Sequence, residues 1–437
     1  MRPVIKIATS PPETLLENRR RRSLPQDFEK QVVEIIKFVK KKGDFALIKL
    51  TEKFDNVNLS TERIKVTEEE IEEAYQKISE EQITAIKYAK KRVEEFERTL
   101  IEKLNFEVEY DGVRIYSRIR PLGRVGCYVP SGVASYPSTV IMTVTPAKVA
   151  GVKNIAVCTP PRKDGKVEPL TLIAADICGV DEVYRVGGAQ AIAALAYGTE
   201  TIKPVEKIVG PGGLYVTIAK LLVSRDVSID LPAGPSEILV LADRNADPKI
   251  IALDMISQAE HGIWGYSILV TTSESLALKV RGQIEKLLDS IPQGKIVAEA
   301  LSRNGLILVL ENIQQCLSFI NEFAPEHVEI MSENSLDMAE KIETAGLVLI
   351  GKYTPVAASD YCLGVNHVLP TGGFGRIYSG LSSLDFVRRI NIVECSKDKL
   401  RKIKDTVEVL AKSEGLYNHA LSLRGRFSKD ELAEKVV

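Results

Sequence analysis

The sequence predicts an α/β fold with parallel sheets, arranged as two consecutive α/β units. From about Arg118 onward, short apolar runs alternate with helical stretches rich in alanine and other small residues. Because these runs are apolar at successive positions, we expect helices to cover both faces of each sheet. The expected strands are 154–158, 183–186, 237–241, 267–272, 306–310, 328–331 and 347–350. The boundary between the two units is expected near 238–243.

The first quarter of the chain is expected to be helical. The segment DFEKQVVEIIKFVKKKG has the spacing of a helix that ends at Gly43. A longer amphipathic helix is predicted over about 79–104. Its apolar stripe consists of Ile83, Ile86, Val93, Phe96 and Leu100. Thr67 followed by Glu70 predicts a capping box at the start of a shorter helix before it.

From about Lys399 the chain returns to helix. The run LRKIKDTVEVLAK is followed by Gly415 and by a short second helix that carries His419. Such a small helical segment has little core of its own. We therefore expect it to pack on another domain or on another chain.

Composition favours a small molecule as the partner. The 437 residues are 45% hydrophobic and 27% charged, an ordinary globular balance. Lys plus Arg number 58 against 59 acidic residues, so no net field favours nucleic acid or an anionic membrane surface. The basic run Arg19 to Arg22 could be a nucleic-acid patch, but its polar, proline-containing surroundings are more typical of a solvated linker.

Cysteine usage predicts a reduced, cytoplasmic protein. The six cysteines form no C-x-x-C pair, and no apolar signal segment stands at the start. No uninterrupted apolar stretch of about 20 residues predicts a membrane span. Cys158, in NIAVCTPP, could be a nucleophile for an aldehyde intermediate, but its apolar context favours a buried structural thiol.

Glycine-rich loops are frequent, yet the usual nucleotide fingerprints are missing. The loops are YVPSG, RVGGAQ, VGPGG, DLPAGPSE and PTGGFG. None is a G-x-G-x-x-G turn after a strand, and no G-x-x-x-x-G-K-[ST] loop is present. Any nucleotide must be held in another way.

Each of the four histidines lies in a short polar motif, and imidazole is both a common metal ligand and a proton carrier near neutral pH. Asp247 and Pro248 begin a helix well, and Gly262 suits its end. Gln258 and His261 should then share one face of the last turn. That is a modest metal signal, because a catalytic zinc needs about three protein ligands, and alone the pair fits polar surface.

Glu326 and His327 follow Pro325 at the entrance to an apolar strand. An imidazole can accept the proton released when an alcohol is oxidised, and an adjacent carboxylate can activate water to attack an aldehyde. The alternative is a solvent-exposed loop end. Asp360, in ASDYCLG, could add an oxygen ligand to the histidines, although an Asp before a turn is usually structural.

Taken together, these motifs resemble histidinol dehydrogenase over about 44–426. The matching segments are GCYVPSGVASYPSTVIMTVTPAKVAGV, RVGGAQAIAALAYGT, DLPAGPSEILVLAD, SQAEHG, FAPEHVEI, DYCLGVNHVLPTGG and EGLYNHA. The resemblance implies oxidation of L-histidinol to L-histidine in two NAD-dependent steps through a bound aldehyde, at the end of histidine biosynthesis. It also implies one zinc ion per subunit.

The resemblance carries roles over to particular residues. It makes Gln258, His261, Asp360 and His419 the zinc ligands. It places Ser236, His367 and Glu414 against the substrate, together with the zinc ligands and His327. It makes Glu326 and His327 the acid–base pair, and it places Tyr128, Gln190 and the loop at Gly213 near the nucleotide.

Three positions depart from the family pattern. Gly213 stands where the family usually has an Asn that contacts NAD, and Ser131 stands where Gly is common. Ile263-Trp264-Gly265-Tyr266 after QAEHG is unusual beside a metal helix. We expect these departures to affect how the nucleotide is bound and how the pocket wall is shaped. They do not involve the expected zinc ligands or the acid–base pair.

The family fold implies two incomplete Rossmann-like domains, akin to aldehyde dehydrogenases, with an N-terminal arm and a helical C-terminal domain in a homodimer whose active site is shared between chains. The expected spans are 1–22 for the arm, 23–125 plus 242–380 for the first α/β domain, 126–241 for the nucleotide side and 381–437 for the helical domain.

Two other functions are open to the sequence. A dehydrogenase of the same superfamily could act on another small alcohol, such as a sulfonated propanediol, but Glu414 and His419 belong to the histidinol-specific part of the pattern. A zinc-dependent binding or regulatory protein would have no use for Glu326 beside His327.

Overall fold

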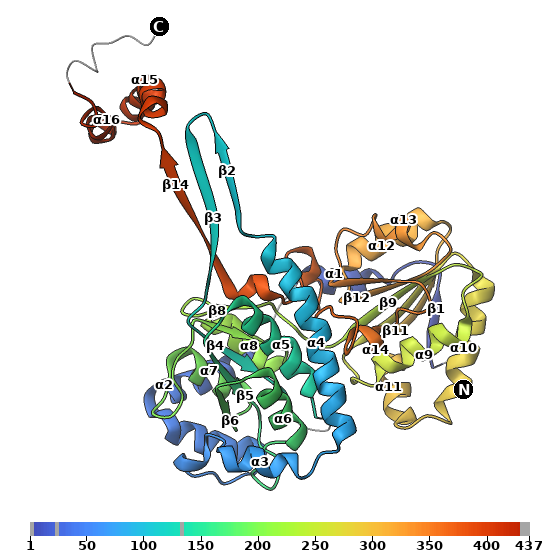
Figure 1. Ribbon diagram of the computed structural model, residues 1–437. Coiled ribbons are helices and arrows are strands. Elements are labelled where there is room, and N and C mark those ends of the chain that lie inside the picture. Colours follow the sequence, from blue (N-terminus) through green and yellow to red (C-terminus); the bar gives the residue numbers. More distant parts are fainter. Residues whose placement is uncertain (1–3, 22–25, 132–134, 429–437) are drawn as a thin grey trace. The chain divides into compact units, whose positions relative to one another are not determined.

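The computed structural model describes residues 4–21, 26–131 and 135–428 (Figure 1). The chain divides into two units. The larger unit consists of Met1–Thr99 and Pro121–Phe386, and the smaller unit of Leu100–Arg120 and Val387–Val437.

One parallel sheet of the larger unit has six strands among the described residues, in the order β1-β11-β10-β9-β12-β13. The strands are β1 (Lys6–Ala8), β9 (Glu237–Ala242), β10 (Tyr266–Thr271), β11 (Gly305–Val309), β12 (His327–Met331) and β13 (Leu347–Ile350). Alternate residues of β9 enter two different cores: Ile238 and Val240 face one, and Leu239 and Leu241 face the other. Both faces are therefore covered, as the apolar runs predict.

Helices supply the two cores of this six-stranded sheet. On one face lie α9 (Pro248–Ala259), α10 (Glu274–Leu288) and α11 (Gly294–Asn304). On the other face lie α1 (Glu13–Arg21), α12 (Ile313–Phe323) and α13 (Ser335–Ala339). Residues 4–21, expected to be an arm, thus contribute an edge strand and a helix that packs against α12.

The second parallel sheet has five strands among the described residues, in the order β6-β5-β4-β7-β8. The strands are β4 (Arg124–Tyr128), β5 (Asn154–Cys158), β6 (Glu182–Tyr184), β7 (Lys207–Val209) and β8 (Ser228–Ile229). One face packs against α5 (Pro137–Ala150), which contacts α6 (Pro169–Cys178). The other packs against α7 (Gly188–Tyr197), α8 (Leu214–Val223) and α2 (Gln26–Asp55).

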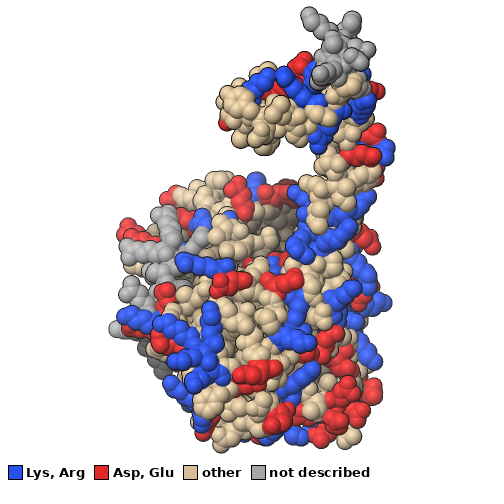
Figure 2. Space-filling view, turned by 90° about the vertical axis from the view of Figure 1, so that its left-hand side faces the viewer, with Lys and Arg blue, Asp and Glu red and all other residues tan. Residues whose placement is uncertain are grey.

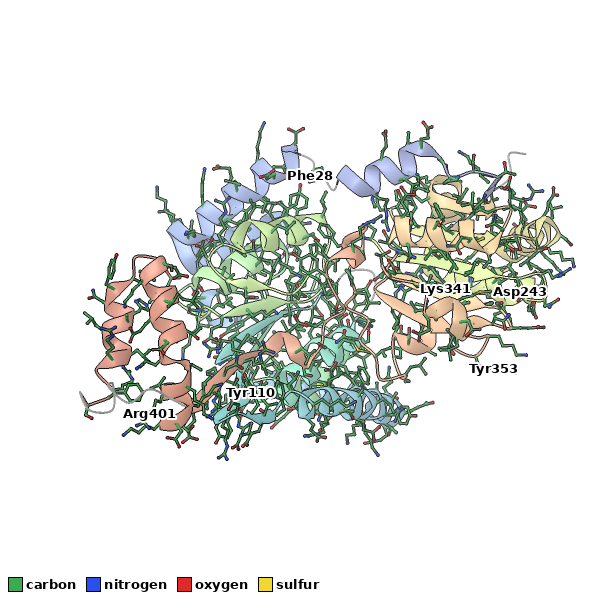
Figure 3. The ribbon with its side chains drawn as sticks, turned by 90° about the horizontal axis from the view of Figure 1, so that it is seen from above. Phe28, Tyr110, Asp243, Lys341, Tyr353 and Arg401 are labelled. Carbon is green, nitrogen blue, oxygen red and sulfur yellow. The ribbon has the colours of Figure 1, made fainter. Side chains whose placement is uncertain are left out.

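The position of α2 differs from the expected domain division. Sequence analysis placed 23–125 with 242–380, whereas α2 packs on α7 and α8 of the five-stranded sheet. Phe28 of α2, labelled in Figure 3, meets Tyr215 of α8 edge to face, with ring centroids 5.3 Å apart. Likewise β9 belongs to the six-stranded sheet, although most of it lies within the span 126–241. Periodicity reveals an apolar face, but not the sheet that covers it.

Local signals in the first quarter are confirmed. The helical path is interrupted at Gly43, with φ 50° and ψ −130°, where the predicted helix ends. The capping box of Thr67 and Glu70 begins α3 (Glu68–Tyr75), and α4 (Glu80–Glu102) corresponds to the predicted long helix. Shorter elements complete the larger unit: η1 (Thr61–Arg63), α14 (Val356–Ser359), η2 (Phe374–Arg376) and η3 (Ser383–Phe386).

After the end of α4, the described part of the smaller unit contains a hairpin, a third strand and two helices. The hairpin strands β2 (Phe106–Tyr110) and β3 (Val113–Pro121) are antiparallel, and β14 (Val387–Cys395) joins β3. The predicted tail helices are present as α15 (Lys397–Ser413) and α16 (Tyr417–Arg424), which pack on each other. Every residue of β2, including Tyr110 (Figure 3), is exposed. The hairpin was not predicted, although FEVEY alternates apolar and acidic residues before Asp111-Gly112.

The surface shows mixed charge. Figure 2 shows Lys and Arg side chains interspersed with Asp and Glu over the visible face. This agrees with the near-equal numbers of basic and acidic residues in the sequence. Among the described residues, no helix is both long and apolar enough to span a bilayer.

Candidate active site

Glu326 and His327 lie where α12 passes into β12. The helix ends at Phe323, Ala324 adopts φ 51°, and His327 is the first residue of the strand. Glu326 and His327 are only 6% and 3% exposed. The alternative of a solvent-exposed loop end is therefore wrong.

The environment of His327 fixes which ring nitrogen faces the site. Its Nδ1 lies 3.1 Å from the carbonyl oxygen of Glu237, which can only accept, so Nδ1 holds a hydrogen and donates it. Its Nε2 lies 3.8 Å from Oδ1 of Asp360. Within the described residues, neither of these two buried atoms has a hydrogen-bond partner. Leaving such groups unsatisfied costs about 1–3 kcal/mol each, and the arrangement is typical of a ligand site.

Glu326 is held in a reciprocal contact with Glu237. The N–H of Glu237 donates to Oε2 of Glu326 at 2.7 Å, and the N–H of Glu326 donates to Oε2 of Glu237 at 3.3 Å. Burial raises the pKa of the Glu326 carboxyl, and the neighbouring His327 opposes that rise. For His327, burial acts to lower the pKa, but Glu326 and Asp360 outweigh it and raise the value to about 9. The pair therefore shares a strong affinity for a proton.

Asp360 ends α14 and contacts a second histidine. Its carbonyl oxygen accepts from Nδ1 of His367 at 3.0 Å, and Nε2 of His367 lies 3.4 Å from Oγ1 of Thr139 in α5. At the start of α14, the N–H of Val356 donates to Oε1 of Glu329 at 2.7 Å. Burial lowers the pKa of His367, and the charges of His327 and His261 act in the same direction while Asp360 opposes them.

Gln258 and His261 lie at the end of α9, which contacts α14. Asp247 caps this helix through the N–H of Lys249, as predicted. Gln258 is buried in the last turn, whereas His261 is exposed and lies just beyond the helix. Because the charge of His261 acts on His367, these residues lie in the same region of the larger unit.

The proposed zinc ligands fit a metal by their chemistry. Nitrogen and oxygen donors of this kind suit zinc, and the buried Oδ1 of Asp360 lacks a partner within the described residues. No three His, Cys, Asp or Glu side chains of the described chain form a ready metal cluster. Of the candidate set, the larger unit contains Gln258, His261 and Asp360. The fourth candidate, His419, is exposed on α16 of the smaller unit.

The candidate nucleotide residues lie around the five-stranded sheet. Tyr128 ends β4, and its hydroxyl oxygen accepts from the N–H of Gly188 at 3.0 Å. Burial raises the pKa of Tyr128 to about 12. Gln190 is buried in the first turn of α7, and Gly213 is the N-cap of α8. All three follow or end strands at the carboxyl edge of the sheet, where α/β folds commonly bind ligands.

A buried ion pair anchors the loop VGPGG at the end of β7. Nζ of Lys220 donates to the carbonyl oxygens of Gly210 at 2.9 Å and Leu231 at 3.1 Å. Lys220 pairs with Asp230, whose Oδ2 accepts from the N–H of Gly210 at 2.7 Å. At Gly213, a Cβ atom would meet nothing within 4 Å. The loop is therefore held in place, and there is open space at Gly213, where the family usually has an Asn.

The remaining predicted residues are Ser236, which directly precedes Glu237, and Glu414 of the smaller unit. Ser236 is half-buried before β9, and its carbonyl oxygen accepts from the N–H of Tyr266 at 3.2 Å. Glu414 is exposed at the end of α15 in the smaller unit. Trp264, one of the unusual residues after QAEHG, is 70% exposed. Cys158 is fully buried, and burial raises the pKa of its thiol, which confirms a structural cysteine.

Sequence analysis missed Glu237 and Arg19. Glu237 is a buried acidic residue at the head of an apolar strand, a signal that was visible in PSEILVLAD. The interpretation of the basic run as a solvated linker is wrong for Arg19, which is buried in α1 and paired with Glu237. No local pattern could reveal a pairing across 218 positions.

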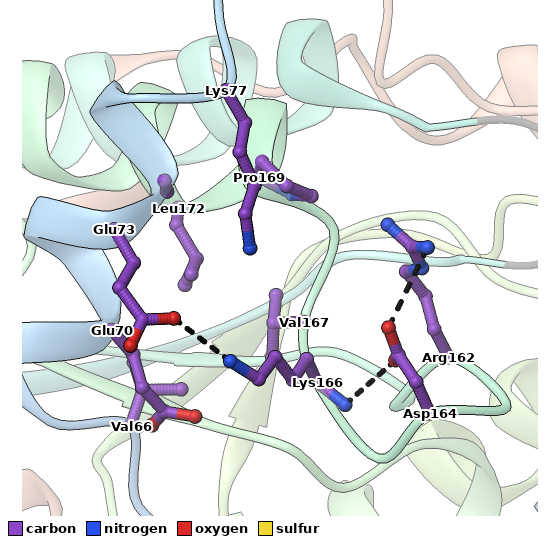
Figure 4. A pocket seen from close by; sticks show the side chains of 11 residues that line it. Val66, Glu70, Glu73, Lys77, Arg162, Asp164, Lys166, Val167, Pro169 and Leu172 are labelled. Atoms are coloured by element: carbon purple, nitrogen blue, oxygen red, sulfur yellow. Dashed lines mark hydrogen bonds and ion pairs between the residues drawn. The ribbon is translucent and has the colours of Figure 1, made fainter.

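A pocket between α3 and α6 contains none of these residues (Figure 4). Four of its charged lining groups form two pairs: Lys166 lies 2.8 Å from Glu73, and Arg162 lies 3.6 Å from Asp164. It is therefore not the site to which the buried pair belongs. The fold is that of an α/β protein, and its buried Glu326–His327 pair lies at the start of β12.

Comparison with known proteins identifies the family. The family model of histidinol dehydrogenase matches residues 18–427. Histidinol dehydrogenase of Methanocaldococcus jannaschii is 44% identical over 97% of both chains, and that of Methanothermobacter thermautotrophicus is 46% identical over 90% of this chain and 92% of its own. The crystal structure of histidinol dehydrogenase from Elizabethkingia anophelis has a TM-score of 0.92 and 37% identity, and covers 98% of each chain. The chain belongs to the histidinol dehydrogenase family and is an oxidoreductase.

Proposed function

We propose that the protein oxidises L-histidinol to L-histidine through bound L-histidinal, the last step of histidine biosynthesis, in the cytoplasm. Two successive oxidations would each use one NAD. The observation that carries this proposal is the pair of buried, facing atoms, Nε2 of His327 and Oδ1 of Asp360, in a chain of this family. A group that accepts a proton and a group that can bind a metal thus face the same space.

Gln258, His261, Asp360 and His419 would hold one zinc ion per subunit. Zinc, when bound, would help to orient the substrate, and NAD would be the hydride acceptor in each step. Ser236, His367 and Glu414 would contact the substrate. His367 has Nδ1 engaged by the carbonyl oxygen of Asp360, which leaves the other edge of its ring to face Thr139 or a ligand.

His327 would remove the hydroxyl proton in the first oxidation. Its Nδ1–H is held by Glu237, so the proton is accepted at Nε2, on the side that faces Asp360. Glu326 would act in the second oxidation by taking a proton from the water that attacks the aldehyde carbon. Its high proton affinity in a buried setting, seen as a raised pKa, suits that role.

Tyr128, Gln190 and the loop ending at Gly213 would bind NAD. They surround the carboxyl edge of the five-stranded sheet, and the loop is fixed by Lys220. Because Gly213 has no side chain, this chain would bind NAD without the contact that an Asn provides.

A homodimer would share each active site between two chains. The smaller unit exposes large apolar side chains on its helices, and its two candidate site residues, Glu414 and His419, are exposed as well. The exposed apolar residues of these helices include Val409, Leu410, Tyr417 and Leu421. Exposed apolar surface of this kind favours a protein partner over a solvated tail.

The test is the stoichiometry of the purified protein with histidinol and NAD. We expect two NADH for each histidine formed, with no release of histidinal. A sulfonated propanediol serves as the matched competitor substrate. Turnover of that alcohol without turnover of histidinol would overturn the proposal in favour of another dehydrogenase.

A further inference from the structure

Arg19 is a buried cation at the end of the N-terminal helix α1. Its side chain is 5% exposed and that of Glu237 is 3% exposed. The guanidinium binds both carboxylate oxygens of Glu237: one nitrogen donates to Oε2 at 2.7 Å, and the other donates to Oε1. A bidentate pair of this kind fixes orientation as well as charge.

The remaining donors of Arg19 hold the end of α12. Nε donates to the carbonyl oxygen of Phe323 at 3.1 Å, and a terminal nitrogen donates to that of Ala324 at 3.3 Å. The guanidinium carbon also lies 3.8 Å from the centroid of the Phe323 ring. These carbonyl groups lie two and three residues before Glu326. Arg19 therefore caps α12 at the point where the chain turns toward the acid–base pair.

Glu237 contacts both members of that pair. Its N–H donates to the Glu326 carboxylate, and its carbonyl oxygen accepts from Nδ1 of His327. Its side chain accepts from the N–H of Glu326 at Oε2 and from the N–H of Gly372 at Oε1, the latter at 3.1 Å. One residue thus orients the carboxylate, the imidazole and the backbone between them.

We propose that Arg19 and Glu237 are positioning residues that set the orientation of Glu326 and His327. The pair needs a guanidinium, because lysine has no planar fork to bind a carboxylate and two carbonyl groups together. It needs a carboxylate, because an amide offers a single acceptor oxygen where both oxygens of Glu237 accept hydrogen bonds. The N-terminal helix is then part of the catalytic apparatus. This inference rests on the proposed roles of Glu326 and His327.

The first test compares two buried arginines. Arg19→Lys should lower kcat by about 10-fold to 100-fold, with the KM for histidinol and the zinc content changed by less than about threefold, because orientation is lost while binding groups remain. Arg185→Lys is the matched control. Arg185 is 1% exposed and pairs with Glu70, and its hydrogen bonds reach none of the candidate site residues. It should lower the melting temperature similarly but leave kcat unchanged.

A paired variant separates positioning from stability. Arg19→Met leaves the buried carboxylate of Glu237 without its counter-ion and should destabilise the protein. Arg19→Met with Glu237→Gln removes both charges and should recover most of that stability. Its kcat should stay low, because the contacts to α12 and the second acceptor oxygen are still missing. Recovery of kcat together with stability would show that the ion pair has a merely structural role.

The outcomes also distinguish this inference from the function on which it rests. If Glu326→Gln and His327→Asn keep normal activity, the proposed roles fail and this inference fails with them. If those two variants are impaired while folded Arg19→Lys keeps kcat within about twofold of the parent, only the positioning role is overturned. An equal loss of kcat in Arg185→Lys would overturn it as well.

Discussion

In one parallel sheet of the larger unit the candidate residues lie at the carboxyl ends of the strands, and in the other they lie at the amino ends. In the five-stranded sheet, Tyr128 and the loop at Gly213 lie at the carboxyl ends of strands. In the six-stranded sheet, Glu237 and His327 are the first residues of β9 and β12, at their amino ends. The rule that α/β sheets bind ligands at their carboxyl edge would find only the first region.

The two edges also differ in what they offer. At the five-stranded sheet, the candidate residues lie in glycine-rich loops with backbone N–H groups. The buried Lys220 supports one of these loops. The six-stranded sheet offers side chains that bind and release protons, held by a buried ion pair. On the proposed function, the five-stranded sheet would bind the nucleotide and the six-stranded sheet would carry the proton-transfer residues.

Removal of zinc should have the largest effect, and it should act on the proton-transfer side. Chelation should reduce turnover to below about one hundredth, because the substrate would lose its orienting partner while Gln258, His261 and Asp360 stay in place. Elemental analysis, NADH formation and a thermal melt are the measurements. Binding of NAD should be little changed. Normal histidinol oxidation by verified metal-free protein would contradict the proposed site.

Mixed dimers should test whether the proton-transfer site is completed by a second chain. His327→Ala and His419→Ala subunits, each inactive alone, should recover activity when they are unfolded together and refolded as a mixture. About half of the dimers would be mixed, and one of the two sites in each would carry neither change. We therefore expect about a quarter of the parent activity. No recovery in a sample shown by differential tags to contain mixed dimers would place the whole site in one chain.

Gly213→Asn should strengthen the binding of NAD and leave the catalytic rate unchanged. A Cβ atom there meets nothing within 4 Å, so the side chain has room to form one new hydrogen bond. We expect the KM for NAD to fall by about threefold to tenfold, with kcat unchanged. Gly212→Asn is the matched control, because its Cβ would come within 2.5 Å of Val216 and should disturb the loop. An unchanged KM for NAD in Gly213→Asn would place the nucleotide elsewhere.

The smallest expected effect concerns Glu329 in β12 and the change of the free energy of unfolding with pH. Burial, with Asp254 nearby, raises the pKa of Glu329 from 4.5 to about 8. The folded state therefore binds a proton that the unfolded state releases, and stability should fall as the pH rises from about 5 to 8. Glu329→Gln keeps an acceptor for Val356 and should reduce that loss by about 1–2 kcal/mol. Denaturant unfolding at both pH values measures it, and an equal loss in both proteins would contradict the assignment.

Much of the fold was predictable because its signals are local. The run at 154–158 is β5, the amphipathic stripe of 79–104 is α4, and the Thr67 capping box begins α3. The hairpin of the smaller unit also had a local signal, because FEVEY alternates apolar and acidic residues and Asp111-Gly112 follows it, but it was not predicted. The sheet against which α2 packs could not be predicted, because an apolar stripe does not identify its partner.

The candidate site likewise has residues that could be predicted from the sequence and residues that could not. Glu326 and His327 stand side by side in the sequence, so their pairing was visible. Arg19 was not, because its neighbours in the chain are basic and its partner is 218 residues away. Burial of an arginine depends on a counter-ion, and that counter-ion is known only once the fold is known.

The most direct measurement is the number of NADH molecules formed per histidinol by Glu326→Gln, with His327→Asn as its counterpart. If the two residues divide the proton transfers, Glu326→Gln should form close to one NADH in a single turnover and accumulate histidinal. His327→Asn should be slow with histidinol but faster when histidinal is supplied. Two NADH per histidinol from Glu326→Gln at the parent rate, or equal losses on both substrates in both variants, would contradict the account.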